Sequence, residues 1–218
     1  MVTLTRADAG RRLAMGLGAM IREVPVVLAL SPGGARVASE IAKAFEAPLD
    51  VIPVHRLEVS GRPRSTFGAV ADGTTLILSE RVAQLGLPDD YVSAMADLAH
   101  REIDLLASAW RGGAPPVTLT GRTAVLADDG LSDPVAIAAA ARSLRGMGAT
   151  RVIFAAPRAS DALCEAIRSE CDDFLLLFDD STPAAASVCD PDFSQTTRFD
   201  VRSMVRRSRP DFAAVVGP

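Results

Sequence analysis

Apolar residues recur along this chain in two patterns, one with helical spacing and one of short continuous runs that is typical of buried strands. After Asp8, apolar positions at helical spacing predict an amphipathic helix that ends near Arg22. Short apolar runs predict strands at 26–30, 49–54, 122–127, 151–156 and 173–178, and helical patterns occupy 35–45, 91–110, 134–147 and 160–169. This alternation predicts an α/β fold, a doubly wound, mostly parallel sheet with helices on both faces.

Two stretches depart from this alternation. Between residues 57 and 80, apolar runs flank Asp72-Gly73, and Asp-Gly between such runs is a strong signal for a hairpin. We therefore expect a small antiparallel hood hairpin there. After residue 180 the periodicity is weak until a short arginine-rich helix near 201–207, which predicts a C-terminal extension over about 181–218. The chain of 218 residues is expected to form one domain, 1–218.

Composition narrows the class of function. Hydrophobic residues make up 49% of the chain and aromatic residues only 5%, which suits parallel strands covered on both faces. The formal net charge of −4 argues against a dedicated nucleic-acid binder and favours a small-molecule ligand. Three cysteines without a Cys-x-x-Cys pair predict a reduced, cytoplasmic protein with no metal site. Charged residues near the start argue against a signal peptide or a membrane span there.

The richest chemistry lies between residues 125 and 136. An apolar strand leads there into Asp128 and Asp129, then a turn, then an alanine-rich helix. In open α/β sheets, ligands bind beyond the carboxyl ends of the strands, where the N–H groups that open the next helix favour anions. Two acids at such a place can accept hydrogen bonds from sugar hydroxyls while the helix start binds a phosphate.

This stretch resembles the ribose-phosphate signature of type I phosphoribosyltransferases, in which two acids follow a strand and Thr-Gly opens the helix. Further segments resemble a bacterial branch of that family in the same order, namely Leu30–Gly34, Val54–Leu57, Phe67–Val70 with Asp72-Gly73, and Asp192–Gln195. The resemblance implies transfer of a phosphoribosyl group from phosphoribosyl pyrophosphate (PRPP) to a nitrogen nucleophile, with Mg²⁺ entering only when PRPP is bound.

The resemblance also implies roles for particular residues. Asp128 and Asp129 would be the catalytic pair that holds the ribose hydroxyls, and charge stabilisation with positioning would supply the rate. Residues facing the ribosyl or phosphate ligand would be Gly33, Gly34, His55, Arg56, Gly130, Leu131, Ser132, Asp133 and Pro134.

The pair Asp133-Pro134 stands where the family has Thr-Gly, and it should weaken phosphate binding. Pro134 removes a backbone donor, and Asp133 is placed to cap the helix and so to occupy the N–H groups that a phosphate would use. An added carboxylate also repels a dianion. Pro32 stands where the branch has arginine, and His55 replaces another arginine, so anion affinity should fall further.

Several alternatives stay open at this point. The two acids can simply begin a solvated loop, Gly33-Gly34 can be a plain strand-to-helix turn, and His55 can be an exposed residue at a strand end. The protein can be an active transferase, a non-catalytic nucleotide- or nucleoside-binding regulator, or a structural subunit of the same fold. The sequence leaves a homodimer open and names neither an acceptor base nor a paralogous partner.

Overall fold

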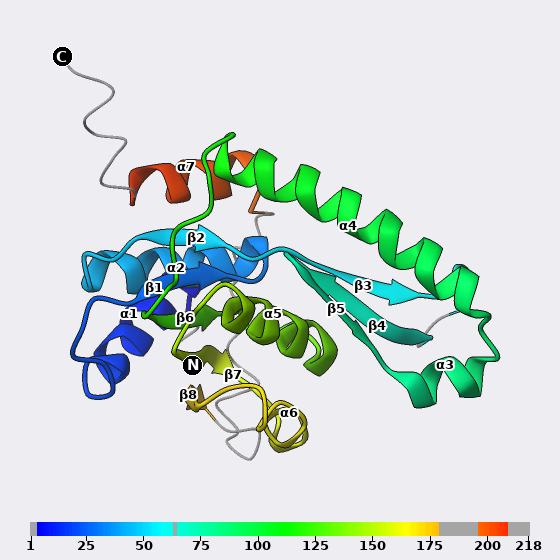
Figure 1. Cartoon of the computed structure of the whole chain (residues 1–218). Coiled ribbons are helices and arrows are strands. Elements are labelled where there is room, and N and C mark those ends of the chain that lie inside the picture. Colours follow the sequence, from blue (N-terminus) through cyan, green and yellow to red (C-terminus); the bar gives the residue numbers. More distant parts are fainter. Residues whose placement is uncertain (1–3, 63–64, 179–195, 209–218) are drawn as a thin grey trace.

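The computed structural model describes residues 4–62, 65–178 and 196–208, and a five-stranded sheet forms its centre (Figure 1). The strand order is β2 (Leu49–Val51), β1 (Val26–Ala29), β6 (Thr123–Ala127), β7 (Arg151–Arg158) and β8 (Asp173–Phe178). All four neighbouring pairs are parallel. The predicted parallel sheet is therefore confirmed.

Helices cover both faces of this sheet, and alternate strand residues divide the core between them. One face packs Val27 and Ala29 against α1 (Arg6–Leu17) and α2 (Pro32–Ala44), with α7 (Arg198–Arg207) packed on α2. The other face packs Val26 and Leu28 against α5 (Pro134–Gly146) and α6 (Asp161–Ala166). Because successive strand side chains point to opposite faces, continuous apolar runs are what such a doubly covered sheet requires.

A second sheet, which we call the hood sheet, is antiparallel and consists of β3 (Val54–Glu58), β4 (Thr66–Ala71) and β5 (Thr74–Ile77). The predicted hairpin around Asp72-Gly73 is its β4–β5 pair. The long helix α4 (Asp89–Arg111) covers one face of the hood sheet and α5 covers the other (Figure 1). Helix α5 thus packs on both sheets and is buried on most of its circumference.

The structure differs from the predicted elements in several places. Helix α1 begins at Arg6 and ends at Leu17 rather than near Arg22. The strand predicted over 49–54 is two strands in different sheets, because Pro53 lies between them and cannot donate to a ladder. Helix α2 begins at Pro32 rather than Ala35, since Ser31 caps it. The short helix α3 (Ser79–Leu85) was not predicted. The segment 192–195 lies outside the described residues.

A buried ion pair joins the two sheets. Asp50 on β2 and Arg111 at the end of α4 form it at 2.9 Å, and their side chains are only 2% and 6% exposed. Asp50 also accepts from the N–H of Val117, and the guanidinium of Arg111 donates to the carbonyl of Val51. The third Arg111 nitrogen lies 3.8 Å from the carboxylate of Asp72 in the β4–β5 turn. The pair therefore ties α4 and the hood sheet to the edge of the central sheet.

Candidate functional site

The acidic loop directly follows β6 at the carboxyl edge of the central sheet. Ala29 of β1 pairs with Ala127 of β6, so the residues after each strand lie side by side. This register brings the start of α2, with Gly33 and Gly34, against Asp128 and Asp129. The expected juxtaposition of these four residues at one edge is present.

Asp128 holds the loop together from the inside. It is 1% exposed, and its Oδ2 accepts from the N–H groups of Gly130, Leu131 and Ser132 at 2.8, 3.2 and 3.2 Å. Its Oδ1 accepts from the Ser132 hydroxyl at 2.7 Å and from the Ser31 hydroxyl at 3.4 Å. Three loop amides that could face an anion thus point inward to a carboxylate. A buried carboxylate with this many donors fixes the shape of its loop.

Asp129 is paired with a residue from the start of the chain. Arg6 on α1 donates to Asp129 Oδ2 from Nε at 3.2 Å and from a terminal nitrogen at 3.1 Å. The two side chains are 14% and 6% exposed. Burial, together with the neighbouring Asp128 charge, raises the pKa of Asp129 above its ordinary value, and Arg6 only partly opposes that rise. Sequence reasoning missed Arg6, because no local pattern links residues so far apart.

Gly33 provides the space in which the Asp129 carboxylate lies. A Cβ built on Gly33 would lie 1.8 Å from Asp129 Oδ2, which is far inside van der Waals contact. Any other residue at position 33 therefore displaces the carboxylate from its place beside Arg6. Close approach to a neighbouring group is one of the uses for which a chain needs glycine.

The start of α5 is the capped terminus that the sequence predicts. Asp133 has an extended backbone, and its Oδ1 accepts from the N–H of Ala136 at 2.9 Å, with Pro134 in the first turn. Its Oδ2 accepts from Arg56 of the hood sheet at 2.9 Å. The hydrogen bond that the Arg56 guanidinium donates to the Asp133 carboxylate raises the pKa of Arg56. Asp133 thus occupies both the N–H of Ala136 at the helix start and Arg56, the nearest cation of the hood sheet.

Arg56 and His55 lie on opposite faces of β3, as neighbouring strand residues must. Arg56 points to the α5 side, whereas His55 Nδ1 lies 2.9 Å from Glu102 Oε2 on α4. The structure therefore brings Arg56 to the acidic loop but does not bring His55 there.

Two further residues complete the loop. Leu131 is 72% exposed at its tip. Gly130 has φ +86°, and a Cβ there would meet the side chain and carbonyl of Arg158 at the end of β7. Arg158 is a second cation at this edge that sequence reasoning missed, although its place at a strand end could have indicated it.

Proteins similar to this chain are known. Two curated relatives from strains of Mycobacterium tuberculosis, both named "Putative phosphoribosyl transferase", are 34% identical in a 215-residue alignment that covers 95% of this chain. The crystal structure of TT1426 from Thermus thermophilus has a TM-score of 0.76 at 29% identity and covers 94% of this chain and 98% of that one. Over nearly its whole length, the chain is thus similar to proteins named putative phosphoribosyl transferase. It spans about half the length of its curated relatives, 47%, and no family model matches it.

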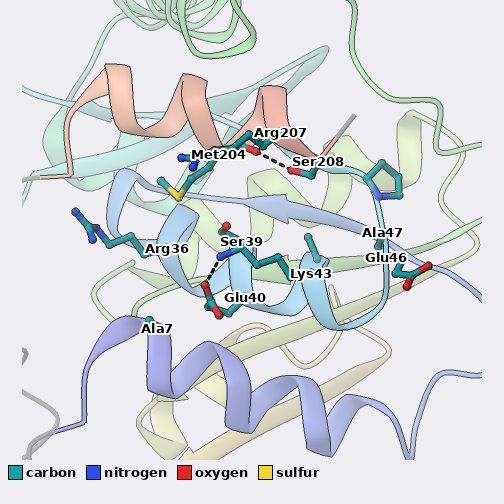
Figure 2. A pocket seen from close by; sticks show the side chains of 12 residues that line it. Ala7, Arg36, Ser39, Glu40, Lys43, Glu46, Ala47, Met204, Arg207 and Ser208 are labelled. Carbon is teal, nitrogen blue, oxygen red and sulfur yellow. Dashed lines mark hydrogen bonds and ion pairs between the residues drawn. The ribbon is translucent and has the colours of Figure 1, made fainter. Parts of the chain in front are cut away.

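The chain also has a cavity away from the acidic loop. Its volume is about 630 Å³, and it lies between α1, α2 and α7 (Figure 2). Its charged lining mixes both signs, with Glu40 of α2 bridging Arg11 and Lys43. The lining residues are Ala7, Arg36, Ser39, Glu40, Ala42, Lys43, Glu46, Ala47, Pro48, Met204, Arg207 and Ser208. The residues of the acidic loop are not among those that line this cavity.

Neither a metal cluster nor a membrane-spanning helix occurs among the described residues of this chain. No group of three or more His, Cys, Asp or Glu side chains in these ranges could hold a metal ion. Among the same residues, no helix is both long and apolar enough to cross a bilayer. The expectation that Mg²⁺ enters only with PRPP stays a prediction.

Proposed function

We propose that this protein binds a ribosyl ligand, a ribose phosphate or a nucleotide-like molecule, at the acidic loop, and that its ability to transfer a phosphoribosyl group from PRPP is weakened. The observation that carries the proposal is the meeting of Asp129, Gly33 and the capped start of α5 at one sheet edge, in a chain similar to proteins named putative phosphoribosyl transferase. Ligands of α/β sheets bind at such edges.

Asp129 is the group that we assign to the sugar hydroxyls. Its Oδ2 accepts from Arg6, and a ribose diol would offer hydroxyl donors to the same carboxylate. Asp128 takes the supporting role, because its two oxygens already accept from the loop. Arg56 and Arg158 are the nearby cations for a phosphate, although Arg56 would have to leave Asp133 to bind one.

Mg²⁺ would accompany PRPP and would neutralise part of the pyrophosphate charge. The chain itself would hold Mg²⁺ only through the bound PRPP, since the carboxylates of Asp128 and Asp129 are engaged by donors of the chain itself.

A non-catalytic nucleotide or nucleoside binder is the second candidate. The inward-pointing amides of the loop favour it, because they leave few donors for a 5-phosphate.

Calorimetric titration with PRPP and Mg²⁺, with nucleoside monophosphates and with free ribosides separates these functions. Binding that requires the phosphate, followed by release of pyrophosphate when a nitrogen nucleophile is added, identifies a transferase. Binding of ribosides and monophosphates alike without turnover identifies a binder.

The variant Asp129→Asn, compared with His100→Ala, tests the assignment of the site. His100 contacts Thr75 on the hood sheet at 2.8 Å, away from the acidic loop, and so serves as a control. We expect Asp129→Asn to weaken binding more, because it removes a charged acceptor from the diol. Equal losses in the two variants, or no binding by the natural chain, would contradict the proposal.

A further inference from the structure

The cavity between α1, α2 and α7 contains a buried hydroxyl group without a partner. Ser39 of α2 lines this cavity and is only 8% exposed. Among residues 4–62, 65–178 and 196–208, its hydroxyl forms no hydrogen bond. Two other buried serines, Ser65 and Ser143, donate to backbone carbonyls of the chain. Because buried polar groups nearly always have a partner, the Ser39 hydroxyl indicates that a molecule binds in the cavity.

Two arginines of the same lining contact only neutral oxygens within the part of the chain that the structure describes. Arg36 of α2 donates through Nε to the Thr196 hydroxyl at 3.0 Å. Arg207 of α7 donates to the carbonyl and the hydroxyl of Ser203 at 3.2 and 2.9 Å. Neither arginine forms an ion pair with a described carboxylate, so both keep their charge available to a ligand.

The two carboxylates of the lining do not neutralise these arginines. Glu40 binds Lys43 at 2.5 Å through one oxygen and Arg11 at 3.2 Å through the other. Glu46 is exposed in the turn after α2, and Figure 2 shows it at the opposite end of the lining from Arg36. The part of the cavity near Arg36 therefore favours an anion.

The rest of the lining is apolar and consists of small or flexible side chains. Ala42 and Ala47 are buried, and Met204 of α7 is half-buried opposite them. The volume of about 630 Å³ lies in the range of roughly 300–1,000 Å³ that is typical of sites for small organic molecules. A ligand that fills this space therefore has an apolar body as well as a charge.

We propose that the cavity between α1, α2 and α7 is a second binding site, which takes a small organic anion with an apolar body. The anionic group accepts hydrogen bonds from Ser39, Arg36 and Arg207, and the charge of the arginines strengthens these bonds. The apolar body lies on Met204 and the alanines of the lining. Because no residue of the acidic loop lines this cavity, the inference does not depend on the proposed function.

Two fluorescent probes that share one skeleton test the proposal by titration. The first is 8-anilinonaphthalene-1-sulfonate, and the second is N-phenyl-1-naphthylamine, which is the same molecule without the sulfonate. The natural chain should bind the sulfonate probe more tightly. Arg36→Gln and Ser39→Ala should each raise the Kd of that probe about 10-fold and leave the neutral probe unaffected, because each removes one hydrogen bond to the anionic group. Arg101→Gln is the matched control, since Arg101 is exposed on α4 and does not line the cavity.

A filling variant and a competition measurement complete the test. Met204→Trp should weaken binding of both probes, because the larger side chain occupies the cavity, and unchanged thermal melting of each variant shows that the fold is intact. Displacement of the sulfonate probe by benzoate or by phenyl phosphate would support the site and distinguish a carboxylate from a phosphate ester. Displacement by neither, equal affinity of the natural chain for the two probes, or equal behaviour of Arg36→Gln and Arg101→Gln would each overturn the proposal.

Discussion

Replacing Asp133-Pro134 by Thr-Gly should restore affinity for PRPP. In the natural chain, Asp133 occupies the N–H of Ala136 and pairs with Arg56, and Pro134 supplies no N–H of its own. The double variant Asp133→Thr, Pro134→Gly removes one carboxylate, frees Arg56 and adds a backbone donor. Each of these changes favours an anion at a helix start.

The size of the gain follows from the charges that change. One carboxylate at about 4 Å from a dianionic phosphate costs ~2 kcal/mol in a water-like medium, since each unit pair costs about 1 kcal/mol. Removing it corresponds to about 30-fold tighter binding, before any contribution from the new N–H donor or from Arg56.

The same change should cost the fold little. Thr keeps a capping oxygen, and the Arg56–Asp133 pair is half exposed on the arginine side, so its loss is worth at most ~1 kcal/mol. Gly in place of Pro gives up about 0.4–1 kcal/mol through the unfolded state. We therefore expect the free energy of unfolding to fall by about 1–2 kcal/mol, which leaves a folded protein for the binding measurement.

Calorimetric titration of both proteins with PRPP and Mg²⁺ is the assay. Asp133→Asn is the matched control, because it keeps the capping geometry while removing the charge, and it should recover the electrostatic part of the gain alone. Tight binding of PRPP by the natural chain, or no gain in the double variant, would refute the electrostatic reasoning about this helix start.

Three further predictions concern buried groups. Asp50→Ala should lower the free energy of unfolding by about 3–5 kcal/mol in chemical denaturation, because it leaves the Arg111 charge buried without its partner; a loss below ~1 kcal/mol would contradict the burial of this pair. The pKa of Asp129, followed by NMR, should exceed 3.8, and Arg6→Ala should raise it further. The free energy of unfolding that this raised pKa contributes is then fully present below pH 3.8 and is lost as the pH rises through the folded-state pKa of Asp129. A depressed pKa of Asp129 would refute this. Burial raises the pKa of the Cys171 thiol to about 12, so its alkylation by iodoacetamide at neutral pH should be about 1000-fold slower than that of a thiol with pKa 9.0, and rapid labelling seen by mass spectrometry would contradict it.

The central sheet could be predicted from the sequence because its strands and helices are encoded locally. Continuous apolar runs indicated strands covered on both faces, and Asp133-Pro134 combined a cap with a first-turn proline, which fixed the start of α5. The division of residues 49–54 was missed, since the apolar run hid the effect of Pro53.

The site was harder to predict, because its decisive contacts join distant parts of the chain. Arg6 reaches Asp129 only through the packing of α1 beside α2, and no spacing rule links the two residues. The sequence did contain a clue about His55 that was not used. Adjacent strand residues point to opposite faces, so His55 and Arg56 could not both face the same ligand.

The burial of α5 between the two sheets determines how the ligand specificity of this protein can change by substitution. Alanines fill both contacts, with Ala138 and Ala139 toward the hood sheet and Ala140 and Ala141 toward the central sheet. Such close packing leaves no room for the helix to slide or tilt, because a shift against either sheet would overlap atoms or open a void. The first turn of α5 is therefore preorganised. The entropy cost of ordering it arises during folding rather than on ligand binding. Adaptation to a new ligand must then proceed by exchanging the few side chains at the loop, while the frame behind them stays fixed.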